Sequence, residues 1–431
     1  MKIKFNILLI LLAVLAAFGK SHATATRQES LPGISAFMLD DQDIFNQPSL
    51  TPFYYRAAIV DLSGDSSRIT GQSSALLTYA NREQTFGVIG LAVNYRSEAA
   101  QNLINYINPF VDTLGIDENL VDKIRDNGLG LNLPPIPQLG SEYDLIYARK
   151  LRDWTAGARA EHSFGQSSYS YSHVENQANC SVTGLTLGLG YDPSDAVRID
   201  AGLSYGRLSF ESSYTLSMPD PLSILNSTES LKSKGLGYLA FSSRAFLSLN
   251  EEMVLVPLVD FKYFDLGYDY AKNYTLVTAG GTDQSTELFL GCGWQYRADN
   301  RMTLLAGLGY GYQSRTIKDS MVYHSLQEKS IASYPSITAG VESNITGWLT
   351  VRVGAEKKIL SQSFTTDFFD NTTLVEKTVT QPYDLALGLA LKMRGLTMDL
   401  MLNPKLIYSG GNIASGSRNW PLTRASLVYR F

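Results

Sequence analysis

Residues 421–431 read Pro-Leu-Thr-Arg-Ala-Ser-Leu-Val-Tyr-Arg-Phe, and this stretch decides the fold. In steps of two back from the terminal residue, one face carries Phe431, Tyr429, Leu427 and Ala425. The other face carries Arg430, Ser426 and Arg424, with Val428 as its apolar exception. A period of two with one apolar face predicts a β-strand. Because the sequence ends with this strand, no later element follows that could cover its apolar face.

This strand resembles the closing strand of bacterial outer-membrane β-barrels. The assembly machinery of such barrels recognises a terminal aromatic residue and an alternating apolar face, so the resemblance implies that Tyr429 and Phe431 form the assembly signal. It also implies two partners, the barrel-assembly machinery and the lipid of the outer membrane. Such a barrel needs an export signal at its start and many alternating strands in between.

The first 23 residues have the three parts of a secretory signal peptide. Lys2 and Lys4 are the positive start, residues 7–18 are the apolar run, and Ser21-His22-Ala23 is a cleavage site, with cleavage after Ala25 as the alternative. The apolar run is shorter than the ~20 residues of a membrane-spanning helix, and no later segment reaches that length. We therefore expect export and insertion into the cell outer membrane by strands.

The composition agrees with a barrel exposed to lipid. The formal net charge is −5, and removal of Lys2, Lys4 and Lys20 with the signal peptide lowers it by three to −8. This acidity argues against nucleic acid as a partner. The 35 Gly and 25 Tyr fit Gly-rich strands with aromatic girdles. The two Cys are too few for a disulfide framework, and Cys292 shares the apolar phase of its segment, which predicts that it faces lipid.

Sixteen alternating segments follow residue 52, and each is long enough to cross a bilayer as a tilted strand. They are residues 53–63, 73–81, 85–96, 141–150, 154–164, 179–191, 196–214, 234–249, 253–269, 285–297, 301–315, 329–343, 348–363, 379–393, 396–407 and 419–431. Lipid offers no hydrogen bonds, so the first strand must pair with the last and close the sheet. The predicted fold class is an all-β, antiparallel, up-and-down transmembrane β-barrel.

The connections between these segments alternate between short and long. The predicted long links are residues 64–72, 97–140, 165–178, 215–233, 270–284, 316–328, 364–378 and 408–418. An outer-membrane barrel has short periplasmic turns, long outer loops and an even number of strands, so this alternation favours a barrel over a soluble sandwich.

The face opposite the apolar one should line the lumen. The charged candidates on it are Arg198, Asp200, Asp260, Lys262, Arg297, Arg352, Glu356, Asp384, Lys392, Asp399 and Arg424. Glycines alternate with them, and a barrel of this strand number is too wide for its side chains to fill. The lumen must then hold water, a plug or cargo. Two roles stay open for the charges, namely pairs that brace the wall and groups that select solutes.

Residues 39–50 read Leu-Asp-Asp-Gln-Asp-Ile-Phe-Asn-Gln-Pro-Ser-Leu. Asp40, Asp41, Asn46 and Pro48 resemble a segment of the family that transports long-chain fatty acids and other hydrophobic compounds. The resemblance implies that residues 24–52, which show no clear period, form a hatch inside the barrel of residues 53–431. It also implies a cargo of small or lipid-like molecules and a barrel of fourteen strands, which is the alternative to sixteen. No ligand-contacting residue of that family can be carried over, because no matching motif is present.

The longest link, residues 97–140, predicts two short helices at 99–111 and 117–127, each with an apolar stripe. A lid over the mouth, a constriction inside it and a self-packed surface loop remain open.

No motif for catalysis, a cofactor or a metal is present, so we expect no enzyme, no cofactor and no metal site. His162, His173 and His324 stand outside any diagnostic spacing. The sequence therefore predicts a channel or transporter for passive uptake of small solutes, hydrophobic ones included. The alternatives are a surface adhesion or structural barrel with a plugged lumen and, third, an outer-membrane hydrolase.

Overall fold

A computed structural model describes residues 25–63, 73–81, 83–95, 142–171, 173–217, 227–234, 237–272, 277–321, 324–367, 372–402 and 422–431. The predicted signal peptide, the predicted helices of residues 97–140 and the link 408–418 lie outside these residues. Among the described residues, no helix is both long enough and apolar enough to cross a membrane.

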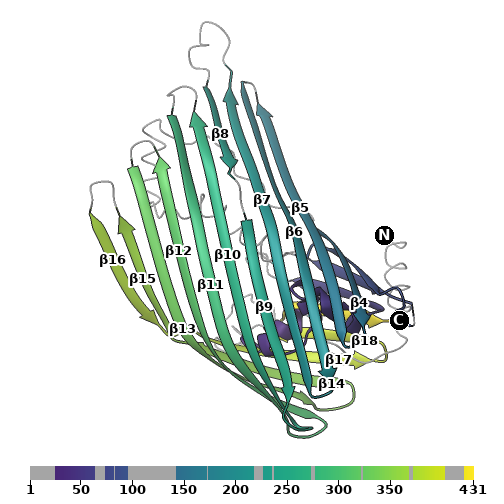
Figure 1. Ribbon diagram of the computed structural model, residues 1–431. Coiled ribbons are helices and arrows are strands. Elements are labelled where there is room, and N and C mark those ends of the chain that lie inside the picture. Colours follow the sequence, from purple (N-terminus) through teal and green to yellow (C-terminus); the bar gives the residue numbers. More distant parts are fainter. Residues whose placement is uncertain are drawn as a thin grey trace, which may run out of the picture.

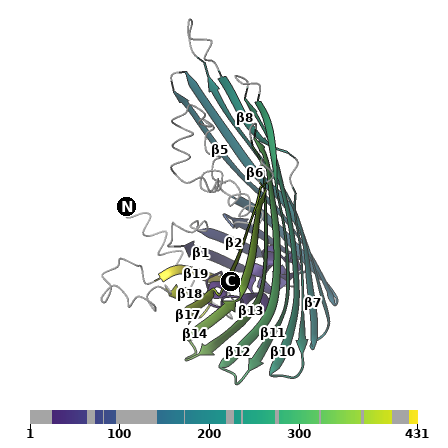
Figure 2. The same ribbon diagram turned by 90° about the vertical axis from the view of Figure 1, so that its left-hand side faces the viewer.

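The described chain forms one antiparallel sheet that closes on itself (Figures 1 and 2). Its strands are β1 Ala57–Ser63, β2 Ser74–Tyr79, β3 Val88–Val93, β4 Glu142–Leu151, β5 Trp154–Tyr171, β6 Val174–Ser194, β7 Val197–Leu216, β8 Ser227–Ser233, β9 Gly237–Ser248, β10 Met253–Lys272, β11 Val277–Arg297, β12 Met302–Met321, β13 His324–Asn344, β14 Leu349–Lys358, β15 Leu360–Asp367, β16 Thr373–Thr380, β17 Tyr383–Met393, β18 Leu396–Leu402 and β19 Leu422–Arg430.

Three barrel strands are each broken into two stretches. β8 and β9 both lie between β7 and β10, while β14 and β15 both pair with β13. β16 pairs with β15 and β17 with β14, so these two also form one strand. The nineteen stretches therefore make a barrel of sixteen strands. This confirms the count expected from the alternating segments, and fourteen, the number implied by the family resemblance, is wrong.

The first and last strands close the barrel. β1 pairs with β19 antiparallel from Ala57 opposite Arg430 to Ser63 opposite Arg424. On its other side β1 pairs with β2, so its backbone groups are bonded along both edges. Closure of this kind leaves no sheet edge in the hydrocarbon, where an unpaired N–H or C=O would cost several kcal/mol.

The wall is much taller on one side than on the other. β1 to β4, β18 and β19 have 6 to 10 residues, whereas β6 and β10 to β13 have 20 or 21. The long strands rise beyond the rest in Figures 1 and 2. Several predicted long links are therefore wrong, because most of 165–178, 316–328 and 364–378 is strand. Outside the membrane both faces of a strand meet water, so the hydrophobic alternation that predicts strands is lost.

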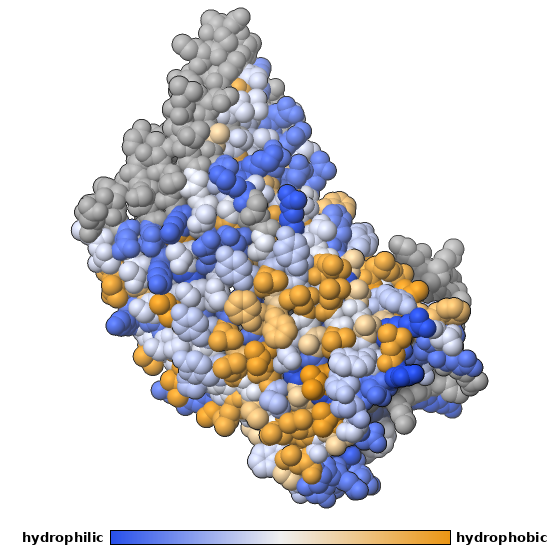
Figure 3. Space-filling model, in the orientation of Figure 1, coloured by the Kyte–Doolittle hydropathy of each residue, from blue (hydrophilic) through white to orange (hydrophobic). Residues whose placement is uncertain are grey.

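The lower part of the outer face carries an exposed apolar belt, which Figure 3 shows in orange below the hydrophilic upper wall. Leu187 and Leu203 are 49% and 46% exposed on it, as predicted for residues that face lipid. Cys292 is exposed there as well. A closed barrel with such a belt satisfies every backbone group while it exposes apolar side chains, so it belongs in an outer membrane.

The N-terminal segment shows no clear period, which predicts an irregular structure. This prediction is wrong. It forms the helical turn α2 Ala25–Glu29 and the 3₁₀ helices η1 Ser35–Phe37, η2 Asp41–Phe45 and η3 Pro48–Tyr54. These turns are too short to bury a regular apolar face of their own. They depend on the barrel wall for packing, and we refer to residues 25–54 as the plug.

Candidate functional site

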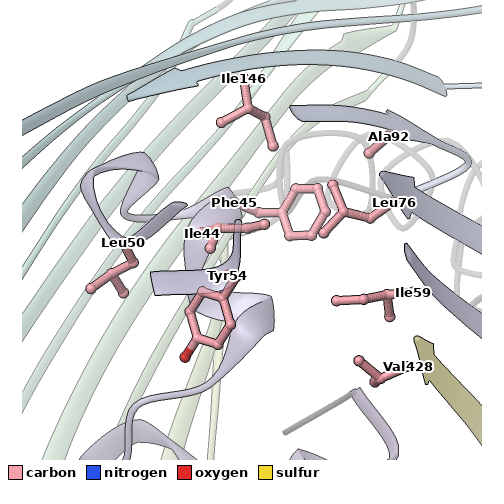
Figure 4. Packing of buried hydrophobic residues seen from close by; sticks show 9 residues of the cluster. All are labelled: Ile44, Phe45, Leu50, Tyr54, Ile59, Leu76, Ala92, Ile146 and Val428. Atoms are coloured by element: carbon pink, nitrogen blue, oxygen red, sulfur yellow. The ribbon is translucent and has the colours of Figure 1, made fainter. Parts of the chain in front are cut away.

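The plug lies inside the barrel and packs on its inner wall. Figure 4 shows apolar side chains of the plug meeting apolar side chains that β1 to β4 and β19 turn inward. The cluster consists of Ile44, Phe45, Leu50 and Tyr54 from the plug and Ile59, Leu76, Ala92, Ile146 and Val428 from the wall. The inner face is therefore apolar where the plug packs. This explains Val428, the exception in the closing strand, which is 2% exposed.

A row of three glycines lets the plug backbone approach the adjacent part of the wall, β5 to β7. Gly157, Gly188 and Gly202 are direct cross-strand neighbours on β5, β6 and β7. A Cβ at Gly157 would lie 2.4 Å from the carbonyl carbon of Pro48, and one at Gly188 would lie 2.7 Å from the backbone N of Ser49. Real Cβ atoms do not come this close to backbone, so this surface requires glycine while the plug is docked.

A second glycine pair holds an aromatic side chain. Gly293 on β11 pairs with Gly307 on β12, and the ring of Phe37 lies on both. A Cβ at Gly293 would be 2.3 Å from Cγ of that ring. Phe37 also packs with Phe246, Val256 and Leu258, so it anchors the middle of the plug on the tall side of the barrel.

Two buried arginines of the wall bind the plug. Arg244 donates to the carbonyl of Met38 at 2.8 Å and to Asp43 at 2.6 Å. Arg159 donates to the carbonyl of Phe45 at 3.2 Å, and its guanidinium lies 5.1 Å from the centre of the Phe45 ring. Both arginines are at most 5% exposed, so these contacts form away from bulk water, where they are stronger.

The first turn of the plug joins a charged network on the other side of the lumen. Arg27 donates to Glu342 at 2.8 Å, and Glu342 also accepts from Arg352 at 2.7 Å. Arg352 continues the network to Asp399 at 2.5 Å. Burial disfavours the charge of Arg27, but the carboxylates of Glu342 and Asp40 outweigh it and raise the pKa of Arg27. Arg27 thus stays cationic and bound.

Polar side chains complete this attachment at the seam where the barrel closes. Thr26 shares a short hydrogen bond with Ser426, which donates to Asp61. Asp61 also accepts from Gln42 of the plug at 3.2 Å. The plug therefore contacts the first and last strands as well as the tall wall.

Three acidic residues around Arg159 are grouped closely enough to hold a metal ion. Glu142, Asp144 and Glu161 have carboxylate oxygens within 4.8 Å of one another, and they are buried. Nη2 of Arg159 lies 3.3, 2.7 and 2.7 Å from oxygens of these three residues. The guanidinium occupies the place that a metal ion would take, so this cluster holds an arginine instead.

A cavity of about 200 Å³ lies in the lumen next to the plug. Its lining includes Gly33 and Ala36 of the plug and, from β10 to β14, Asp260, Lys262, Glu287, Phe289, Gln313, Tyr334, Glu356 and Lys358. On each of these strands the cavity residues lie farther from the short turns than the residues that contact the plug. The cavity therefore lies on the side of the plug that faces away from the short turns, toward the far ends of the tall strands.

The structure brings together some of the predicted lumen residues and separates others. Asp260, Lys262 and Glu356 line the cavity. Five others lie in ion pairs at the level of the plug. Arg352 pairs with Asp399, Arg198 donates to Asp200 at 2.9 Å, and Arg424 binds Glu29. Lys392 donates to Asn344 at 3.0 Å near the short turns. Arg297 and Asp384 are exposed and belong to neither group.

The predicted hatch residues all lie in the plug. Asp40 caps η2, and Asp43 accepts from its backbone N–H at 2.7 Å. Asp41 opens the same helix, while Asn46 and Pro48 lie against the glycine row. At the other end of the chain, Tyr429 is buried and Phe431 is exposed, with ring centres 6.1 Å apart.

Sequence reasoning did not single out the two residues that hold the plug most directly, Arg159 and Arg244. Both fall inside predicted strands and in the phase of the lumen face, which is the signal that could have found them. Of the histidines, His162 is exposed and meets Thr183 at 3.0 Å, and His173 is exposed in the turn between β5 and β6. Among the described contacts, neither histidine has a carboxylate partner.

A scan against protein-family models finds no match, and a search of curated proteins finds none either. Among solved structures, the chain is similar to the CymD monoaromatic hydrocarbon channel, with 10% identity, coverage of 96% of this chain and 99% of that chain, and a TM-score of 0.40. A Pseudomonas aeruginosa FadL homologue has 10% identity, 96% and 100% coverage and a TM-score of 0.36. The Pseudomonas putida toluene transporter TodX has 10% identity, 96% and 97% coverage and a TM-score of 0.32. At such identities and TM-scores no property of these proteins is carried over, and the barrel fold rests on the strand pairings of the chain itself.

Proposed function

We propose that the barrel is an outer-membrane channel for passive uptake of small solutes, hydrophobic ones included, and that the plug is its gate. The observation that carries the proposal is the way in which the plug is held. Hydrogen bonds, ion pairs and glycine contacts attach it to strands all around the barrel, from β1 to β19. Both cysteines are free and lie in the wall, so within the described residues the plug is held, apart from its chain link to β1, by noncovalent contacts that can break and form again.

The cavity supports the same proposal. It lies against the plug and is lined by aromatic rings and charged groups from five strands. A solute that enters from the side of the tall wall would meet this cavity first and the plug next. Movement of the plug would then open the way toward the short turns.

A reversible lock tests the gate. Thr26 and Ser426 touch through their hydroxyl groups, so Thr26→Cys with Ser426→Cys places two thiols at plug and wall. The background carries Cys180→Ala and Cys292→Ala. We expect oxidation to lower the conductance of the protein in planar bilayers, and the uptake of a hydrophobic probe by cells that carry it. Reduction should restore both.

The matched control joins wall to wall. Ser181 on β6 and Ser209 on β7 lie 2.7 Å apart through their hydroxyl oxygens and do not belong to the plug. Ser181→Cys with Ser209→Cys should change neither measurement upon oxidation. If the oxidised plug lock is as permeable as its reduced form, the plug is not the gate.

The second candidate function is a surface adhesion barrel with a permanently plugged lumen. The wall that rises above the belt favours it, because β16 is exposed along its whole length and presents both faces. In that case no reduced or oxidised form would conduct. Substitution of exposed residues in β16 would instead abolish the attachment of cells to a surface.

A further inference from the structure

An open groove of about 420 Å³ lies on the wall across β5 to β8. The pairing of β7 with β8 ends at Glu211 and Lys232, and its pairing with β9 begins only at Gly206 and Tyr238. The ladder along β7 is therefore interrupted, and Figure 1 shows β8 above β9 at this place. The groove lies beside the interruption, and its polar lining includes Gln166, Asn179, Ser181 and Ser209.

The polar residues of the groove face away from the lumen. Ser181 and Ser209 share the phase of Leu187 and Leu203, which are exposed on the belt, because the faces of a strand repeat every two residues. Gln166 and Asn179 are direct neighbours on β5 and β6, and both are exposed. The groove is thus open to the surroundings of the barrel and separate from the plug.

The groove begins where the apolar belt ends. Toward the short turns, the pair Ser181 and Ser209 is followed by the pairs Thr183 and Arg207, Leu185 and Tyr205, and Leu187 and Leu203. Leu185 and Tyr205 are 48% and 57% exposed. Since a strand rises about 3.3 Å per residue, Leu185 lies roughly 13 Å and Leu187 roughly 20 Å below the serine pair. A lipid with its acyl chains on these leucines would therefore place its headgroup in the groove.

The side chains of the groove suit a sugar. The amides of Gln166 and Asn179 each offer one acceptor and two donors. Ser181 and Ser209 add two hydroxyl groups, whose oxygens lie 2.7 Å apart. Phe164, which is 53% exposed, places an aromatic ring in the same groove. A sugar ring has hydroxyl groups around its edge and an apolar C–H face, so polar groups beside an exposed aromatic ring complement it.

We propose that the groove binds the sugar headgroup of a glycolipid in the outer leaflet of the membrane. The acyl chains would lie on the leucines of the belt, and the sugar rings on Phe164 with their hydroxyl groups bonded to Gln166 and Asn179. Arg207, which is exposed between groove and belt, would pair with a phosphate on the headgroup. A volume of about 420 Å³ lies within the range of sites that hold small molecules. The inference goes beyond the proposed function, because the groove is on the outer face of the wall and does not depend on the plug.

Three lipids test the proposal. The first is a bisphosphorylated, acylated glucosamine disaccharide, the second is the same lipid without its phosphates, and the third is phosphatidylglycerol, which has acyl chains and a phosphate but no sugar. Native mass spectrometry of the purified full-length protein in detergent measures how many molecules bind and how tightly. We expect the bisphosphorylated disaccharide lipid to bind about tenfold or more tightly than phosphatidylglycerol. The free disaccharide should compete only weakly, because it lacks the contacts with the belt.

A matched pair of variants shows whether the groove is responsible. Asn179 and Gln177 are both exposed on the outer face of β6, two residues apart, and only Asn179 lines the groove. Asn179→Ala should weaken binding of the disaccharide lipids about three- to tenfold through lost hydrogen bonds and leave phosphatidylglycerol unchanged, whereas Gln177→Ala should bind all three lipids like the unmodified protein. Gln166→Ala replaces Asn179→Ala if that variant does not fold.

Two further variants separate the parts of the headgroup. Phe164→Ser removes the aromatic surface and should weaken both disaccharide lipids alike. Arg207→Gln should weaken the bisphosphorylated lipid more than the form without phosphates. Equal weakening of both forms by Arg207→Gln would refute the phosphate contact.

The inference is overturned if the disaccharide lipids bind no more tightly than phosphatidylglycerol. It is also overturned if Asn179→Ala and Gln177→Ala bind the disaccharide lipids alike. Full competition by the free disaccharide would refute the lipid as the occupant, because the groove would then take soluble sugars.

Discussion

Gly188→Ala and Gly190→Ala form a matched pair that tests how the plug is docked. Both glycines lie on β6, two residues apart, and both face the lumen. A Cβ at Gly188 would lie 2.7 Å from the backbone N of Ser49 and 2.8 Å from that of Pro48. At Gly190 the nearest atoms are 3.4 to 3.7 Å away, which is ordinary contact. One methyl group should therefore displace the plug at the first position and fit at the second.

The magnitude follows from the overlap. A Cβ at Gly188 must gain roughly 0.7 Å to reach ordinary contact with plug backbone, which has no rotamer to change. Overpacking of this kind costs about 1–3 kcal/mol. Because hydrogen bonds between neighbouring strands hold the wall in place, we expect the plug to move away from it. The docking equilibrium would then shift by about 5- to 150-fold toward the undocked form.

Hydrogen–deuterium exchange measures this shift directly. The protection of peptides that cover residues 41–54 reports the population in which the plug is open. We expect exchange in these peptides to accelerate for Gly188→Ala by the factor above, with strand peptides unchanged. Gly190→Ala should match the unmodified protein. If both variants exchange alike in residues 41–54, the close approach of plug and wall does not control docking.

Three further outcomes follow from the contacts of the plug and the belt. Arg244→Met leaves the partly buried Asp43 without its 2.6 Å partner, which costs up to about 3–5 kcal/mol, so conductance in planar bilayers should rise. An unchanged conductance would show that this pair does not hold the gate. Phe37→Ala removes the ring that lies on Gly293, which should cost about 3–5 kcal/mol of packing free energy. It should accelerate hydrogen exchange in residues 31–38 more than in residues 41–54. The reverse order would show that Phe37 does not anchor the plug. Leu187→Arg places a charge on the lipid face and should destabilise the folded barrel by up to about 2–4 kcal/mol in denaturant titrations in lipid. Leu187→Phe should leave the stability unchanged. Equal stability of the two variants would mean that Leu187 does not face hydrocarbon.

The sequence determined where the barrel crosses the membrane. Within the belt one face of each strand meets hydrocarbon and the other meets the lumen, so side chains alternate with period two and can be counted. That is why the sixteen strands, their antiparallel order and the pairing of the 53–63 segment with the 419–431 segment could be predicted, while the register came from the structure. The same reasoning missed the upper wall, because a strand with water on both faces has no such alternation.

Only the tertiary structure decided what the lumen face is for. In the sequence, Gly157, Gly188 and Gly202 are small residues in the inward phase of three separate strands. The register of those strands makes them direct neighbours, and the plug then lies on them. Arg159 and Arg244 likewise gain their role from backbone carbonyls far away in the chain. Periodicity reports which solvent a face meets, whereas the identity of a contact depends on register and closure, which bring distant residues together.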